Sequence, residues 1–381
     1  MLHNSRRVYL DYAAATPVLS EVTRTVRDRF ENVYANPSSI HEEGREAKEI
    51  LEESRKKVAS FCGVKSREVI FMSGATEANN TALLGTLKRF SNEGKTPHVI
   101  STEIEHKSTL EVLKAYGKDG GTVTLLAPDG GGVISPQGIA KHITESTVLV
   151  SVTLVNSEIG VEQQTADIKR VLPEGVLLHV DAVQAPVYRA VNMHSLGADL
   201  MTLDAQKMYG PKGVGVLVAK TECIPDPVFF GGGQERGLRP GTENVPLISG
   251  FAEAFAYVEA HRKEERIRLK ELGEHFKKLL TVEIPEVVLI GNQKNKAPHI
   301  FSFALPNVHH EYLAVILDQR GFAIGTGSAC APGEGAISHV FKALGFNQGG
   351  IRVSFGRDTK ERDLTQFVKT LKAVLTEFDS I

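Results

Sequence analysis

Apolar and polar positions follow two alternating patterns between about residues 45 and 250. Apolar residues at helical spacing predict helices over 45–61 and 78–87, and short apolar runs rich in β-branched residues predict strands. We predict strands over 68–72, 97–101, 122–126, 148–155, 176–180, 200–203 and 215–218. This alternation predicts an α/β fold with a mostly parallel, helix-covered sheet, in which ligands bind beyond the carboxyl ends of the strands.

The pattern changes after residue 251. A long helix is predicted over 248–280, and the charged residues 262–266 in its middle are typical of a solvated helix face. The later segments 299–304, 311–319, 351–355 and 364–378 resemble a smaller α+β domain. A chain of 381 residues is long enough for two or three domains, and we place a boundary near 250–260.

The charge balance and the cysteine content exclude several classes of protein. Lys and Arg number 44 against 46 Asp and Glu, and this near-neutral balance gives no electrostatic footprint for stable binding to nucleic acid or an anionic membrane. No apolar stretch follows Met1 and no apolar run reaches about 18 residues, so we expect a cytoplasmic protein without a membrane partner. The three widely spaced cysteines, Cys62, Cys223 and Cys330, exclude a disulfide framework.

Polar residues that follow predicted strands are candidates for chemistry. The segment 73–77 follows one strand and opens a helix, where backbone N–H groups and the hydroxyl of Thr76 suit a phosphate, although a simple helix cap is an equally ordinary explanation. His106 follows the next predicted strand, and Asn156 follows a later one. A lone histidine is often structural and asparagine commonly forms turns, so a structural role stays open for both.

Asp181 and Lys207 form a more informative pair. Asp181 follows the almost wholly apolar strand 176–180, where a buried carboxylate needs a cation or hydrogen bonds, and Lys207 follows the next strand. Pyridoxal phosphate requires these two groups, since a lysine forms the Schiff base and a carboxylate keeps the pyridine nitrogen protonated. A plain salt bridge is the alternative.

A series of motifs extends over nearly the whole chain, in segments 9–17, 36–41, 73–80, 105–107, 179–184, 207–213, 231–244, 327–330 and 351–357. With these motifs the chain resembles the pyridoxal-phosphate-dependent cysteine desulfurases of the class V aminotransferase group, in the branch that serves iron–sulfur clusters. The resemblance implies a fold-type I architecture with a seven-stranded, mostly parallel sheet. It further implies a large cofactor-binding domain over 17–255, and a small α+β domain, made of 1–16 and 256–381, that carries the catalytic cysteine loop.

The resemblance also implies roles at the ring of the cofactor. Lys207 would form the Schiff base, Asp181 would hold the pyridinium nitrogen, His106 would stack on the ring, and Gln184 would reach the phenolic oxygen.

At the phosphate, the resemblance implies the backbone of Ala75 and the hydroxyl of Thr76, joined by Thr242 from the second subunit of a homodimer. The family has Ser-x-His before the lysine, whereas this chain has Asp204, Ala205 and Gln206. Gln206 can still donate to phosphate. An ionised Asp204 cannot donate, so it points away, binds something cationic, or reduces the affinity for the cofactor.

For the substrate, L-cysteine, the resemblance implies that Asn156 and Arg352 receive the carboxylate and that Cys330 is the nucleophile. Glycines and a proline around Cys330 indicate a loop, whereas Cys62 and Cys223 are interpreted as inert. Alanine would leave, and the persulfide sulfur would pass to an acceptor for iron–sulfur clusters or tRNA thiolation. Two departures, Ser157 and the segment 331–333, fall near these residues. A selenocysteine lyase, a class V aminotransferase and a cofactor-binding homologue with impaired turnover remain as alternatives.

Overall fold

The computed structural model describes residues 7–94, 96–306, 308–326 and 337–379, and within them the chain forms three sheets surrounded by helices. The helices are α1 (Ser20–Asn32), α2 (Glu42–Cys62), α3 (Ala75–Asn92), α4 (Lys107–Lys118), α5 (Pro136–Ala140), α6 (Thr165–Val171), α7 (Met193–Leu196), α8 (Val245–Glu283), α9 (His310–Gln319), α10 (His339–Ala343) and α11 (Glu361–Asp379). The strands are β1 (Val8–Tyr9), β2 (Val69–Met72), β3 (His98–Thr102), β4 (Thr122–Leu126), β5 (Thr147–Thr153), β6 (Leu177–Asp181), β7 (Leu200–Asp204), β8 (Gly215–Ala219), β9 (Val288–Ile290), β10 (Ile300–Ala304), β11 (Phe322–Ala323) and β12 (Ile351–Ser354).

The largest sheet has seven strands in the order β2-β8-β7-β6-β5-β3-β4. β8 runs antiparallel to both of its neighbours, and the other pairs are parallel. The predicted seven-stranded, mostly parallel sheet is therefore confirmed. Because six strands share one direction, their carboxyl ends meet at the same edge.

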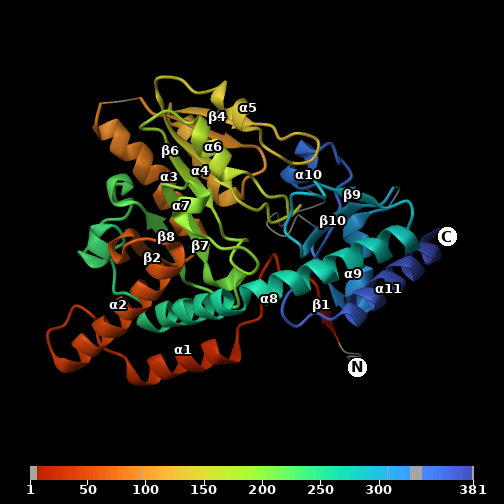
Figure 1. Ribbon diagram of the computed structural model, residues 1–381, viewed down its shortest axis with the longest axis horizontal. Coiled ribbons are helices and arrows are strands. Elements are labelled where there is room, and N and C mark those ends of the chain that lie inside the picture. Colours follow the sequence, from red (N-terminus) through yellow and green to blue (C-terminus); the bar gives the residue numbers. More distant parts are fainter. Residues whose placement is uncertain (1–6, 95, 307, 327–336, 380–381) are drawn as a thin grey trace.

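Successive residues of a strand face opposite layers of the molecule. In β2, Ile70 and Met72 pack with residues of α3, whereas Val69 and Phe71 join the larger core, in which the ring of Phe71 meets Phe251 of α8 edge to face. Helices consequently cover both faces of the sheet (Figure 1). This arrangement explains why β2 and β8 are apolar throughout rather than alternating.

One predicted strand is longer than the observed one. The prediction for 148–155 extends beyond β5, which ends at Thr153. Leu154 and Val155 are fully buried, but the N–H of Leu154 makes only one further bond to β6, at Asp181, and Val155 bridges Glu162 instead. Their apolar character therefore reflects burial more than strand pairing, and burial is what a sequence pattern reports.

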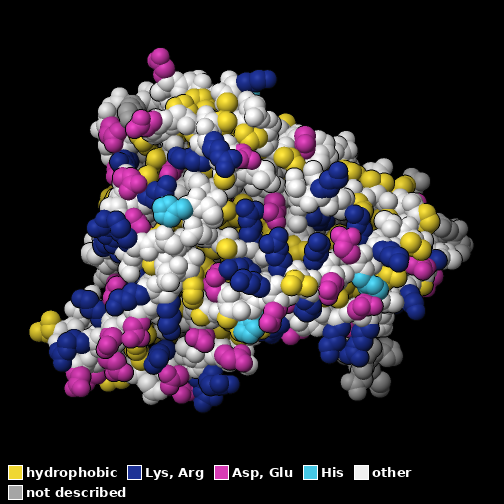
Figure 2. Space-filling view, in the orientation of Figure 1, with side chains coloured by type: hydrophobic (Ala, Val, Ile, Leu, Met, Phe, Trp, Pro, Cys, Tyr) yellow, Lys and Arg dark blue, Asp and Glu magenta, His cyan; other side chains and the backbone are white. Residues whose placement is uncertain are grey.

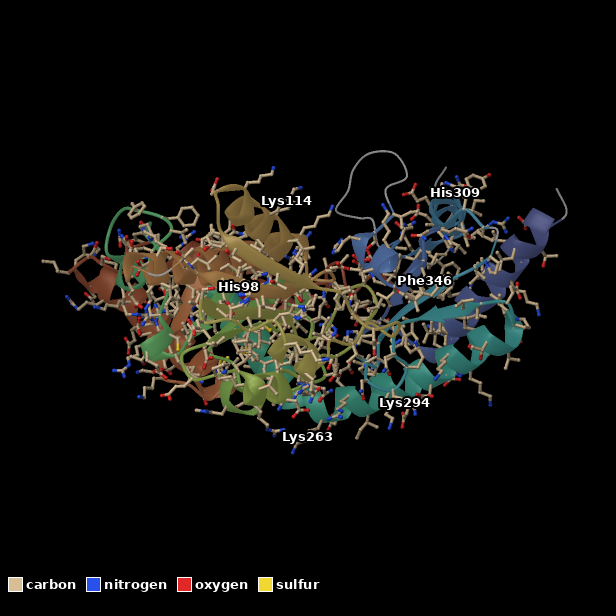
Figure 3. The ribbon with its side chains drawn as sticks, turned by 90° about the horizontal axis from the view of Figure 1, so that it is seen from above. His98, Lys114, Lys263, Lys294, His309 and Phe346 are labelled. Carbon is tan, nitrogen blue, oxygen red and sulfur yellow. The ribbon has the colours of Figure 1, made fainter. Side chains whose placement is uncertain are left out.

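The later part of the chain forms a three-stranded antiparallel sheet in the order β12-β10-β9, with α9, α10 and α11 nearby. Segments predicted over 299–304, 311–319, 351–355 and 364–378 correspond to β10, α9, β12 and α11. α8 runs from the large sheet to this part, and Lys263 in its middle points away from the body of the molecule (Figures 1 and 3). The N-terminal β1 pairs in parallel with β11, which brings the start of the chain to the C-terminal elements.

Acidic and basic side chains are interspersed over the face of the molecule shown in Figure 2. None of the helices in the described ranges combines the length and the apolar character that crossing a bilayer would require.

Candidate active site

A cavity of about 530 Å³ lies where the carboxyl ends of β5, β6 and β7 meet the start of α3 and α4. This volume is in the range of pockets for small molecules and cofactors. Most of the residues predicted from the sequence line it: Ala75, Thr76, His106, Asn156, Asp181, Gln184, Gln206, Lys207 and Arg352. The fold therefore brings together residues that are spread over almost the whole chain.

Lys207 ends the short 3-10 helix Ala205–Lys207, which follows β7 directly. Its Nζ donates to the carbonyl oxygen of Ala13 at 3.0 Å and also to that of Ala14. The hydroxyl of Thr16 donates to the carbonyl of Gln206 and accepts the N–H of Tyr209. The N-terminal segment thus fixes the turn on both sides of the lysine and holds its amine at the cavity.

Asp181 is the last residue of β6 and is buried. One carboxylate oxygen accepts the N–H of Val183 at 3.1 Å, and the other accepts Nδ2 of Asn79 at 2.9 Å. Asn79 is itself fully buried on α3 and also donates to the hydroxyl of Ser108. These hydrogen bonds hold the carboxylate in place at the cavity, which Asp181 lines. Sequence reasoning missed Asn79, although it lies one helical turn after Ala75.

His106 is the N-cap of α4, and its Nδ1 accepts the backbone N–H of Ser108 at 3.1 Å. The ring opens onto the cavity, while the protein behind it removes much of its water. This burial lowers the pKa of His106 most; Asp181 opposes the shift and Lys207 adds to it. A ring that stays neutral at pH 7, with Nδ1 held by the helix, presents a flat face at a defined angle.

The phosphate end predicted from segment 73–77 is formed by the first residues of α3. Ser73 is not the cap, because Gly74 holds the N-cap position and no side chain caps the helix. The carboxylate of Glu77 accepts the N–H of Ser73 at 2.6 Å. Ala75 is the first residue of α3, so its N–H has no acceptor within the helix. It donates at 2.9 Å to a carboxylate oxygen of Asp204. Asp204 therefore points toward the predicted phosphate position and not away from it.

Arg352 on β12 is buried, and its guanidinium donates to a carboxylate oxygen of Asp11 at 2.7 Å and to the carbonyl of Ser157 at 3.1 Å. Its Nε is buried without an acceptor among the described residues. Gly325 makes this position possible, since a Cβ there would lie 2.9 Å from Nη2 and 3.0 Å from Nε. Because Arg352 uses the backbone of residue 157, the serine at that position has little consequence.

Asn156 and Gln184 line the cavity, yet their amides are largely engaged. Asn156 donates to the carbonyl of Ile104 and accepts the N–H groups of Glu158 and Ile159, which is the turn-forming role considered above. One N–H of its amide remains for a ligand. Gln184 donates to the carbonyl of Ala13 at 2.8 Å.

Two carboxyl groups at the cavity were not predicted. Burial raises the pKa of Glu105 to about 8 and that of Glu158 to about 7. Glu105 accepts the hydroxyl of Thr102 at 2.6 Å, and Glu158 accepts the hydroxyl of Ser338. The segments Glu105-His106 and Asn156-Ser157-Glu158 contain both residues, but nothing in the sequence shows that these carboxyl groups are buried.

One predicted residue does not line this cavity, and another lies outside the described residues. Thr242 is exposed and is absent from the described residues that line it. Cys330 lies outside the described residues, as does segment 331–333, but the residues before and after are described. Gly325 contacts Arg352, and residues 337–340 line the cavity.

The two other cysteines are free thiols with structural positions. Cys62 ends α2 fully buried, and burial raises its pKa well above the ordinary thiol value. Cys223 ends a short 3-10 helix and is also buried, which raises its pKa to about 11. Neither is a thiolate at neutral pH, as their inert interpretation requires.

The donor set fits pyridoxal phosphate at its ring end. An amine at Lys207, a fixed carboxylate at Asp181 and a neutral ring at His106 are the groups that this cofactor uses. Arg352, which lines the cavity, suits the carboxylate of an amino acid beside it. At the phosphate end Thr76 and the N-terminus of α3 fit, whereas the carboxylate of Asp204 does not suit a second anion.

Comparisons with known proteins agree with this geometry. The model of the aminotransferase class-V family matches residues 8–367. A cysteine desulfurase IscS of Dictyoglomus turgidum is 36% identical over 381 residues, which cover 99% of this chain and 96% of that protein.

Solved structures agree as well. A NifS-like protein superimposes with a TM-score of 0.89 at 32% identity, covering 97% of this chain and 99% of the other. The structure of SspA in complex with cysteine gives a TM-score of 0.79 at 30% identity, covering 91% and 98%. The fold-type I architecture predicted from the motifs is thereby confirmed. The chain belongs to the aminotransferase class-V family of pyridoxal-phosphate-dependent enzymes, among its cysteine desulfurases.

Proposed function

We propose that this protein removes sulfur from L-cysteine, releasing L-alanine and leaving a persulfide on Cys330. The observation that carries the proposal is the meeting of Lys207, Asp181 and Arg352 in one cavity, in a chain related to cysteine desulfurases over its length. The cysteine bound to SspA supports this choice of substrate. When bound, pyridoxal phosphate supplies an electron-accepting ring that stabilises negative charge on the substrate α-carbon.

The chain's own residues then divide the work. Asp181, held by Asn79 and the N–H of Val183, keeps the proton on the ring nitrogen. Arg352 binds the substrate carboxylate with its guanidinium, and Asn156 assists with its remaining N–H. The amine of Lys207 takes the α-proton. The cofactor is held by the remaining residues, Gln184, His106, Thr76, Ala75 and Gln206.

Cys330 is the proposed nucleophile. Its thiolate attacks the sulfur of the substrate, a sulfur–sulfur bond forms, the carbon–sulfur bond breaks, and the carbon skeleton leaves as alanine after protonation. Residues 337–340 line the cavity and Gly325 pairs with Arg352, and both support this role because they flank the segment that contains Cys330. An acceptor protein would then receive the sulfur for iron–sulfur clusters or tRNA thiolation.

We propose a homodimer in which Thr242 completes the phosphate site of the other subunit; its exposure away from its own cavity supports this. We also propose the two domains, 17–255 and 1–16 with 256–381. The pairing of β1 with β11 and the bridge from Asp11 to Ser354 support the assignment of the first residues to the small domain. The cytoplasmic location stays a prediction.

The test is the production of alanine and sulfide from cysteine by the wild-type protein and by three variants. Lys207→Ala should lose both products. Cys330→Ala should keep the visible absorption of the bound cofactor but lose sulfide release, while the control Cys223→Ala should retain it. Unchanged sulfide release by Cys330→Ala would remove that residue from the mechanism. Selenocysteine and alanine–keto acid pairs, offered in parallel, test the lyase and aminotransferase alternatives.

A further inference from the structure

The carboxylate of Asp204 is the least expected group at the cavity. Asp204 ends β7, is 3% exposed, and caps the short 3-10 helix that carries Lys207. One of its oxygens accepts the N–H of Gln206 at 3.1 Å. The other accepts the N–H of Ala75 at 2.9 Å and Nε2 of Gln206 at 3.3 Å. A single side chain therefore engages three donors at the start of α3 and the end of β7.

Two of these donors are the ones that we assign to the cofactor phosphate. The N–H of Ala75 lies at the positive end of the α3 dipole, which is an ordinary place for a phosphate oxygen. The amide of Gln206 is the remaining donor from the segment before Lys207. A carboxylate that accepts from both stands where a phosphate oxygen would stand.

The backbone around Asp204 is closely packed. Gly215 of β8 pairs with Asp204 across the sheet, and a Cβ at Gly215 would lie 2.6 Å from the carbonyl carbon of Gly74. The start of α3 is therefore held directly against β8, beside Asp204. Backbone shifts cannot easily separate Asp204 from Ala75, so a phosphate that enters must displace the side chain or lie beside a second negative charge.

We propose that Asp204 is an internal occupant of the phosphate subsite, which the cofactor phosphate must displace, and that it limits affinity specifically for the phosphorylated cofactor. This inference rests on the proposed function, because it assumes that pyridoxal phosphate binds in this cavity. It excludes one of the three possibilities left open by the sequence, since Asp204 does not point away from the phosphate position.

The test compares two ligands on cofactor-stripped protein. Pyridoxal phosphate and pyridoxal share the ring and the aldehyde and differ in the phosphate, so the difference between their dissociation constants isolates the phosphate subsite. Asp204→Asn removes the charge and keeps the size, and Asp204→Ser gives a short hydroxyl donor. Absorption of the bound chromophore reports binding without any turnover. Asp119→Asn, at the exposed far end of α4, controls for the change in net charge.

We expect both Asp204 variants to bind pyridoxal phosphate at least about tenfold more tightly than wild type, with pyridoxal and the control changing less than about twofold. The inference would be overturned if the dissociation constant of pyridoxal phosphate did not change in the variants, or if their affinity for pyridoxal rose by the same factor. If the variants fail to fold, the two dissociation constants of the wild-type protein test the inference by themselves. The inference requires that wild type prefers the phosphorylated ligand by less than about a hundredfold, and a larger preference contradicts it.

The two proposals fail in different ways. If wild type and variants bind neither ligand, the proposed function fails and the inference with it. If wild type binds pyridoxal phosphate and converts cysteine while the variants gain nothing, the inference alone fails.

Discussion

At the scale of single residues, burial decides the charge state of the groups around the cavity. Desolvation raises the pKa of Glu105 and Glu158 and lowers that of His106, because it disfavours the charged form in each case. The cavity therefore carries less charge at neutral pH than its residues suggest. Asp181, Arg352 and Asp204 each make several hydrogen bonds there.

Glu105 gives a prediction about stability. Its pKa is raised from 4.5 to about 8 in the folded protein, so between these values the folded state binds more protons than the unfolded state. The stabilisation that Glu105 contributes is therefore greatest at low pH, and it is lost as the pH rises toward 8. Glu105→Gln should match wild type near pH 5 and be more stable by about 2–5 kcal/mol near pH 9.

Urea denaturation at both pH values measures this difference. Glu103→Gln, at an exposed position two residues earlier, is the matched control and should follow wild type at each pH. Parallel pH dependence of wild type and Glu105→Gln would show that Glu105 does not titrate in this range.

At the scale of elements, α8 connects the two parts of the molecule through close packing. The guanidinium of Arg268 donates to the carbonyls of Gly356 and Thr359, near the end of β12. Gly273 lies closest to the rest of the chain, because a Cβ there would lie 2.3 Å from the carbonyl oxygen of Pro298. A glycine in the middle of a helix costs about 1 kcal/mol relative to alanine, and this contact explains its presence.

Gly273→Ala should therefore destabilise the protein by about 1–3 kcal/mol, despite the better helix propensity of alanine. Gly117→Ala on α4 is the control, since a Cβ there would meet Val123 at an ordinary 3.8 Å. It should be neutral or stabilising by up to about 1 kcal/mol. Thermal and urea unfolding of both variants measure the contrast, and equal effects would refute the steric explanation.

At the scale of the whole molecule, the position of Thr242 gives the sharpest prediction. It belongs to a loop fixed by the buried ion pair between Arg55 and Glu235, whose carboxylate also accepts the N–H of Phe71. Glu235 and Arg236 take positive φ angles of 46° and 61°, which this ion pair helps to maintain. An anchored, exposed loop that does not line its own cavity is suited to serve a neighbouring subunit.

Subunit mixing tests this arrangement. Thr242→Ala should weaken the binding of pyridoxal phosphate about tenfold or more, the loss of one hydrogen bond to a charged group, and Lys207→Ala should lose turnover. In a heterodimer of the two variants, one site regains both residues if Thr242 acts across the interface. Co-expressed, differently tagged subunits should then convert cysteine at low cofactor concentration, as heterodimers of wild type and Lys207→Ala do. No recovery would place Thr242 within its own subunit.

Much of the site was predictable because parallel strands place their carboxyl ends together. Asp181 and Lys207 follow neighbouring strands, so their meeting required only the strand pattern and the direction of the strands. Asn79, Asp11 and Glu158 were not predictable as partners, because they bond to Asp181, Arg352 and Ser338, which lie far from them along the chain. The distance between Asp11 and Arg352 in sequence illustrates this, since the pairing of β1 with β11 brings them together.

The sequence by itself determined the family, the strand-and-helix pattern of the large sheet and the residue types at the cavity, since these depend on local periodicity and on motifs. The tertiary structure alone decided which groups lose their water and which donors are already used. The sequence left three possibilities for Asp204, and the structure selects among them because packing against Ala75 and Gly215 aims its carboxylate at the start of α3. Burial and hydrogen-bond partnership arise between distant segments, and no local pattern records them.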